Sequence, residues 1–287
     1  MTVIKFQGIL FSIIAVMVAI ISTFWKPDDS LFYLIILATI IFFLGVPHGA
    51  LDPIFVKKLL MISTWKSWLF FLLLYCALGI AMAIFWMLSP LLFMITFLVL
   101  SVLHFSRDLE STTPVITKLL YGGAVIVLPT LLHYTTMVKL FSLILSLHDG
   151  LLIVDFLDLI AIPYLIIVVI ALLKESYKNT FQAIEFFSVS LLAILAQPLL
   201  SFTVFFCGMH SIRHVLRTKN YSALSWRTIF LTSLLPMIGI ALIILLSWIY
   251  LPTSPNYPRT LQLTFVILAC LTLPHMLLVD RVLFRPV

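Results

Sequence analysis

Long apolar runs alternate with short polar breaks along the whole chain. Several runs reach or approach the ~20 residues that cross a hydrocarbon core, and no break is long enough to fold as a separate soluble domain. Reading the runs against charged and proline-containing breaks predicts ten membrane helices. They cover residues 8–25, 31–56, 68–88, 91–106, 115–133, 159–173, 182–197, 199–217, 226–250 and 260–280. We therefore expect an all-α fold, a polytopic integral membrane helical bundle of about eight to ten transmembrane helices, with residues 1–287 as a single transmembrane domain.

Two runs need a separate interpretation. The run 8–25 follows Lys5, but no small-x-small cleavage site comes after it, so we interpret it as an uncleaved first helix rather than a signal peptide. The run 136–147 is too short for a span and is typical of an interfacial or re-entrant piece. The seventh and eighth predicted spans are separated only by Gln197-Pro198.

Composition agrees with a membrane protein and excludes an ordinary soluble domain. Hydrophobic residues make up 63% of the chain and charged residues 10%, whereas soluble domains are roughly 45–50% apolar. Cys76, Cys207 and Cys270 lie inside apolar runs without paired spacing. This pattern indicates neither a disulfide framework nor a zinc knuckle.

The basic residues test the predicted topology, because they were not used to draw the spans. A cytoplasmic N-terminus places most of the 17 basic residues on the inner side. These are Lys5, Lys57, Lys58, Lys66, Arg107, Lys118, Lys174, Lys178, Arg213, Arg217, Lys219, Arg227, Arg281 and Arg285, leaving Lys26, Lys139 and Arg259 outside with Asp28, Asp29, Asp149, Asp155 and Asp158. We expect a multi-pass protein of the inner cell membrane with both termini cytoplasmic. The basic excess is then a topology signal and implies no nucleic acid.

Polar residues interrupt the apolar pattern in three short segments. Residues 45–52 read GVPHGALD, residues 104–108 read HFSRD, and residues 207–214 read CGMHSIRH. The topology puts five of the seven histidines in one layer near the cytoplasmic face. They are His48, His104, His210, His214 and His275, whereas His133 and His148 fall at the opposite membrane side.

A shared layer of histidines favours a metal site. His210 and His214 are four residues apart, a spacing that puts both imidazoles on one helical face. Ionisable groups within spans are costly and normally face a partner inside the bundle, and one ion could serve several imidazoles. Neutral imidazole suits iron, copper, nickel or zinc. Asp52 and Asp108 each follow a histidine by four residues, so they could orient an imidazole, bond a neighbour or bind the metal themselves.

Simpler interpretations stand beside the metal site. A single histidine near a membrane interface is more often solvated or hydrogen-bonded than a ligand. Asp52, Asp108, Arg107 and Arg213 could be ordinary helix ends that set the topology. Cys207 precedes His210 by one turn, yet buried cysteines are more often structural than ligating. The 24 phenylalanines could line a hydrocarbon tunnel or simply face lipid and neighbouring helices.

These segments, together with Leu273-Pro274-His275-Met276, resemble the Brp/Blh family of membrane β-carotene 15,15'-dioxygenases. The resemblance extends over nearly the whole chain. It implies an iron(II) (Fe2+) enzyme that uses dioxygen (O2) to cleave β-carotene at its central double bond into two all-trans-retinal molecules. Its iron ligands would be His48, His104, His210 and His214.

The resemblance has further implications for the surroundings of the site. Asp52, Asp108 and His275 would belong to the site wall or support the ligands. The substrate would enter from the lipid bilayer into an apolar tunnel, because a hydrocarbon offers no ligand atom. The product retinal would pass to a rhodopsin.

Other histidine-rich membrane proteins are alternatives. A di-iron lipid desaturase or hydroxylase would carry His-x-x-His-His boxes, which this sequence lacks. A haem electron carrier would use facing histidines, and a metal transporter would place ionisable residues at mid-membrane depth, where only Glu185 lies. A retinal-binding photoreceptor would need a lysine deep within a span, but the lysines lie at loops or span ends.

Overall fold

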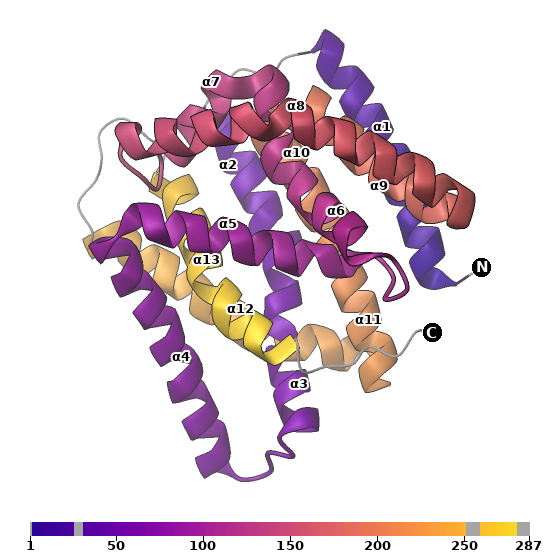
Figure 1. The fold of residues 1–287 in the computed structure, drawn as a ribbon. Coiled ribbons are helices and arrows are strands. Elements are labelled where there is room, and N and C mark those ends of the chain that lie inside the picture. The colour runs from indigo at the N-terminus through magenta and orange to yellow at the C-terminus, as the bar shows by residue number, and fades with distance from the viewer. Residues whose placement is uncertain (1, 26–30, 251–258, 280–287) are drawn as a thin grey trace.

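A computed structural model describes residues 2–25, 31–250 and 259–279. Within these ranges the secondary structure is entirely helical, which confirms the predicted all-α fold (Figure 1). The α-helices are α1 (Val3–Phe24), α2 (Leu31–Ile40), α3 (Asp52–Leu59), α4 (Trp65–Leu88), α5 (Pro90–Phe105), α6 (Val115–Val127), α7 (Thr130–Phe141), α8 (Leu147–Lys178), α9 (Thr180–Leu195), α10 (Pro198–Val204), α11 (Ile212–Ser222), α12 (Trp226–Tyr250) and α13 (Arg259–Val279). Four segments of other helical type are η1 (Ile41–Gly45), η2 (Val46–Leu51), η3 (Ser106–Asp108) and η4 (Phe205–Ser211).

Eight helical segments in the described ranges are long and apolar enough to cross a membrane. The consecutive helices α6 and α7 add a ninth candidate if the pair counts as one broken span. The remaining predicted span, 182–197, corresponds to α9, a shorter apolar helix. The count of about eight to ten transmembrane helices is therefore confirmed.

Three boundaries differ from the sequence prediction. The predicted span 115–133 is not one continuous helix, because α6 and α7 meet at a bend of 64° beside Pro129, which cannot donate a helical hydrogen bond. Much of the short run 136–147 belongs to α7. Helix α8 begins at Leu147 rather than residue 159, because Ser146 caps it by accepting a hydrogen bond from the Asp149 amide.

Burial separates central from peripheral helices. Met82 is the one buried residue of α4, whose other side chains are exposed or half-buried. Its apolar surface all round is typical of a helix that faces lipid. In contrast, the segment Pro198–Ser222, which comprises α10, η4 and α11, is 61% buried over its most apolar part. Helix α1 packs along α9, and α13 packs along α4. The segment with His210 and His214 therefore lies inside the bundle.

Two membrane segments lose regular α-helical geometry beside candidate histidines. The segment η1 is a π-helix followed directly by the 3-10 helix η2, which contains Pro47 and His48. The segment η4 is a second π-helix and contains His210. The two approach closely at Gly45, where an added Cβ would lie 2.4 Å from the Phe206 ring. Local π-helical turns occur often at functional sites because they re-aim side chains.

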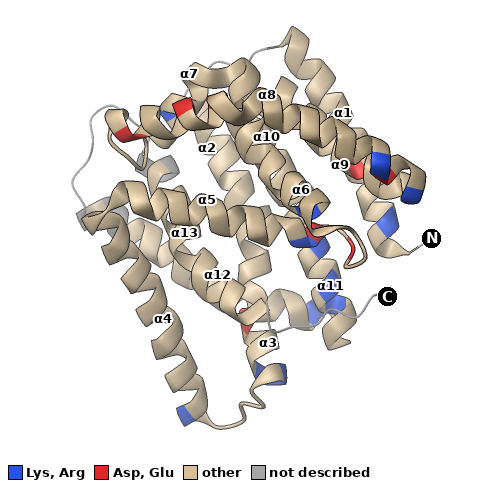
Figure 2. Ribbon diagram, viewed as in Figure 1, with Lys and Arg blue, Asp and Glu red and all other residues tan. Residues whose placement is uncertain are grey.

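Basic residues are concentrated at one end of the bundle, where some acidic residues also lie (Figure 2). Lys and Arg gather around α11, α3 and the last turns of α8, whereas acidic residues of the first half of α8 lie at the other end (Figure 2). This separation agrees with the predicted topology. Several residues used in that prediction lie outside the described ranges, namely Lys26, Asp28, Asp29, Arg281 and Arg285.

Candidate metal centre

Five histidines from five segments far apart in the chain meet inside the bundle. His48 comes from η2, His104 from the last turn of α5, His210 from η4, His214 from α11 and His275 from α13. All five are buried. The ring centre of His48 lies 5.0–6.2 Å from those of the other four, and the His104 and His210 ring centres are 4.5 Å apart. The structure therefore brings together all five histidines that the sequence places in one layer.

The other two histidines lie elsewhere. His148 is exposed at the start of α8, and His133 is half-buried in α7. Cys207 is buried, and its thiol contacts the Ile40 carbonyl rather than the histidines, with 3.7 Å between Sγ and O. This contact agrees with a structural cysteine.

Hydrogen bonds hold three of the five rings in one tautomer. The Nδ1 atom of His48 lies 2.5 Å from the Gly45 carbonyl oxygen, and that of His275 lies 2.7 Å from Asp52 Oδ1. The Nδ1 atom of His210 lies 3.0 Å from Asp108 Oδ2. Because a carbonyl and a carboxylate can only accept, each Nδ1 carries the proton and donates it. The Nε2 lone pairs of His48 and His275 are then available for a metal, as in most protein sites with histidine ligands, whereas that of His210 faces His104 Nε2.

The distances between nitrogens suit a single ion. Ligand nitrogens of His48, His104 and His275 lie within 4.8 Å of one another, and His104 Nε2 lies 2.9 Å from His210 Nε2. A nitrogen bound to a divalent ion such as zinc lies about 2.1 Å from it, so two such nitrogens are at most about 4.2 Å apart. Nitrogens of His48, His104 and His275 would have to move slightly closer together to share one ion, and the His214 ring centre lies 5.5 Å from that of His48.

Unpartnered nitrogens support the same interpretation. His104 Nδ1 and His275 Nε2 are buried without a hydrogen-bond partner. A buried polar atom without a partner costs free energy, on the order of 1–3 kcal/mol. The protein supplies no partner for the lone pair of His275 Nε2. A metal ion at the cluster would be such a partner.

The two candidate carboxylates support histidines from other segments. Asp52 bonds His275 of α13 rather than His48, and Asp108 bonds His210 of η4 rather than His104. Of the roles left open by the sequence, hydrogen bonding to a neighbouring histidine is the one observed. Asp52 also accepts a hydrogen bond from the Tyr75 hydroxyl, at 2.7 Å from Oδ2. Nothing in the sequence pattern indicated Tyr75, which lies inside the apolar run of α4.

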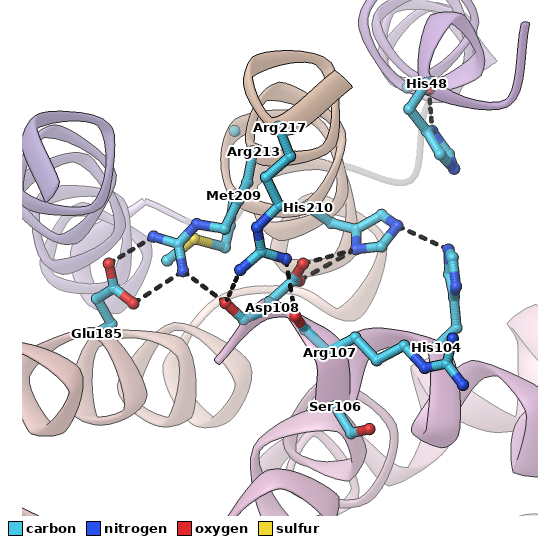
Figure 3. A network of polar contacts seen from close by, with 12 residues as sticks. His48, His104, Ser106, Arg107, Asp108, Glu185, Met209, His210, Arg213 and Arg217 are labelled. Carbon is cyan, nitrogen blue, oxygen red and sulfur yellow. Dashed lines mark hydrogen bonds and ion pairs between the residues drawn. The ribbon is translucent and has the colours of Figure 1, made fainter. Parts of the chain in front are cut away.

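A buried ion pair anchors the segment that holds Asp108. Arg213 donates to both carboxylate oxygens of Glu185, at 2.9 and 2.5 Å, and to the Asp108 backbone carbonyl (Figure 3). Its Nε also donates to Gln7 Oε1 of α1. Arg217 donates to the backbone carbonyls of Arg107 and Asp108. Arg213 thus has a role inside the bundle beyond setting the topology, whereas the Arg107 side chain is exposed.

Two cavities border the histidine cluster from different sides. The first has a volume of about 810 Å³ and an almost wholly apolar lining from α4, α5, α12 and α13. The second has a volume of about 1020 Å³ and includes Lys5, Lys58 and Lys118 in its lining. His48, His104 and His275 line the apolar cavity, and His104, His210 and His214 line the polar one.

Comparison with known proteins assigns the family. A family model described as Beta-carotene 15,15'-dioxygenase matches residues 39–282, a range that contains all five clustered histidines. The Beta-carotene 15,15'-dioxygenase of uncultured marine bacterium 66A03 is 31% identical, over 86% of this chain and 92% of that protein. No solved structure matches the chain. The chain therefore belongs to the β-carotene 15,15'-dioxygenase family.

Proposed function

We propose that this protein cleaves β-carotene at its central 15,15' double bond with dioxygen. One dioxygen molecule is consumed per carotene, and each all-trans-retinal product receives one oxygen atom. The observation that carries this proposal is an apolar cavity lined in part by a buried cluster of histidines. The chain's membership of the β-carotene 15,15'-dioxygenase family supports it. The alternatives of a desaturase, haem carrier, metal transporter or photoreceptor have no comparable support.

The apolar cavity fits a hydrocarbon substrate. Its lining includes Phe42, Trp68, Phe202 and Phe206, and its volume of about 810 Å³ falls in the range of ligand pockets. A polyene has no group that a hydrogen bond or ion pair could hold, so the shape of the cavity must set its position. The cavity is bordered by His48, His104 and His275. A carotenoid lying along it would bring a double bond beside these rings.

Iron(II) is the proposed metal, and His48, His104, His210 and His214 are its proposed ligands. When bound, it supplies the centre that activates dioxygen. The protein's own contribution is to present neutral imidazoles in a fixed tautomer, through the Gly45 carbonyl and the Asp108 carboxylate. All four rings are buried, and the apolar cavity beside His48 and His104 would keep bulk water from reactive species on that side of the site.

Expression in a bacterial host that accumulates β-carotene tests this function. The parent protein should consume the carotene and form two molecules of retinal for each molecule of β-carotene lost. Chromatography of extracted pigments measures both. His210→Ala should abolish the conversion, because removing one imidazole disrupts the metal site, whereas His148→Ala, which changes an exposed residue far from the cluster, should retain most activity. Unchanged carotene in the presence of folded, iron-loaded parent protein would contradict the proposal.

The proposal also covers the membrane location of the enzyme and the routes of its substrate and product. We expect the protein in the inner cell membrane with both termini cytoplasmic, which the gathering of Lys and Arg at one end of the bundle supports. β-Carotene would enter the apolar cavity from the lipid bilayer, since both are apolar. Retinal would leave to the same membrane and be available there to a rhodopsin.

A further inference from the structure

His275 lies among the other four histidines of the cluster and not only along the wall of the site. Its ring centre is 5.1 Å from those of both His48 and His104 and 5.3 Å from that of His214. A ligand nitrogen of His275 is also within 4.8 Å of ligand nitrogens of His48 and His104. Its Nε2 atom is buried and has no hydrogen-bond partner. These features are those of a ligand.

Asp52 and Tyr75 fix the orientation of His275. The His275 Nδ1–H donates to Asp52 Oδ1 over 2.7 Å, and the Tyr75 hydroxyl donates to Asp52 Oδ2 over 2.7 Å. Both carboxylate oxygens of Asp52 are thus engaged by these two side chains. The arrangement leaves the lone pair of His275 on Nε2, and the hydrogen bond to a carboxylate makes that lone pair more basic.

The charge of Asp52 points to a cation at the cluster. The Asp52 side chain is 3% exposed, and its hydrogen bonds come from His275 and Tyr75 rather than from Lys or Arg. A buried carboxylate is costly unless a positive charge offsets it. The other side of the His275 ring offers a place for such a charge, because Nε2 there has no hydrogen-bond partner.

We propose that His275 is a fifth imidazole ligand of the metal, and that Asp52 and Tyr75 are positioning residues that hold it. This inference rests on the proposed metal-dependent function and extends the ligand set that it uses. Tyr75 and His275 both line the apolar cavity, so this ligand is supported from the side on which the carotenoid would lie.

The test uses Co2+ as a visible probe in the purified, metal-free full-length protein. His275→Ala should weaken Co2+ binding by more than the about 10–100-fold that loss of an outer hydrogen-bond partner costs, and it should change the Co2+ absorption bands. Added imidazole should restore the parent spectrum, because it can occupy the space left by the side chain. Tyr75→Phe should weaken binding by about 10-fold, at the lower end of that range.

Tyr164→Phe is the matched control for Tyr75→Phe. The Tyr164 hydroxyl donates to the Leu120 carbonyl, away from the cluster, so its loss also removes one hydrogen bond but should leave Co2+ affinity and spectrum unchanged. A His275→Ala protein with the parent spectrum and affinity, alongside a His48→Ala protein that loses both, would overturn the fifth ligand alone. A parent protein that binds neither Co2+ nor Fe2+ would instead overturn the proposed function.

Discussion

At the scale of single residues, the site depends on hydrogen bonds that join segments far apart in the chain. Asp108 and His210 are 102 positions apart, and Asp52 and His275 are 223 apart. Each carboxylate fixes the tautomer of an imidazole that belongs to another segment. A change to either carboxylate should therefore affect the metal before it affects the fold.

Asp108→Asn tests this at the residue scale. The amide keeps the shape of the side chain but removes its negative charge, so affinity for Fe2+ or Co2+ should fall about 10–100-fold. Metal titration of the metal-free protein measures this loss. Asp155→Asn, which removes the charge from the partner of the Tyr134 hydroxyl, should leave the affinity unchanged. Equal losses in the two variants would show that Asp108 does not act through His210.

The sequence predicts which histidines form this site better than it predicts which residues hydrogen-bond to them. The depth of each histidine follows from topology alone, which explains why all five were found. The partners of Asp52 and Asp108 depend on how helices pack, and spacing along one helix says nothing about that. Tyr75 and Gln7 were missed for the same reason, since each gains its role only through a distant segment. Tyr75 lies within an apolar run, and Gln7 directly precedes one.

At the scale of elements, departures from α-helical geometry bring the histidine segments together. The π-helix η1 and the 3-10 helix η2 precede α3, and the π-helix η4 joins α10 to α11. Gly45 lies where η1 meets Phe206 of η4, too close for any side chain. Apolar periodicity shows no such change of helix type, so it predicted the spans 31–56 and 199–217 without locating η1 or η4 within them.

Gly45→Ala tests this close approach. The new methyl group would overlap the Phe206 ring, so the two segments must separate, at a cost of about 1–3 kcal/mol. We expect a lower melting temperature in detergent and weaker metal binding. Gly79→Ala is the control, because its Cβ would meet Leu271 at an ordinary 3.7 Å. If Gly45→Ala matched the parent in both measurements, the contact between η1 and η4 would not position the histidines.

At the scale of the whole molecule, the bundle has an apolar periphery and an apolar core that encloses a group of polar side chains. Long helices such as α4 and α12 expose large apolar side chains, whereas the histidines and the Arg213–Glu185 pair are buried. The number of spans was predictable because each apolar run needs a membrane or a core. That residues 1–287 form one domain, with both ends cytoplasmic, stays a prediction.

Gly239→Trp tests whether the large apolar cavity holds the substrate. Gly239 of α12 lines this cavity, and an added Cβ would meet no atom within 4 Å. An indole there should occupy carotenoid space without straining the backbone. We expect at least about a tenfold loss of kcat/KM, which is about 1.4 kcal/mol of transition-state stabilisation, with unchanged metal content.

The neighbouring position supplies the control for this variant. Ile238 is exposed on α12 and is absent from the cavity lining. Ile238→Trp should therefore retain the parent's kcat/KM. Normal cleavage by Gly239→Trp would place the carotenoid elsewhere.

His104 borders both cavities, so the histidine cluster separates an almost wholly apolar space from one whose lining includes charged side chains. On one side lies space suited to a hydrocarbon from the bilayer, and on the other lies space lined by lysines and arginines. The proposed carotenoid would lie against His48, His104 and His275, which leaves His210 and His214 to border the charged space instead.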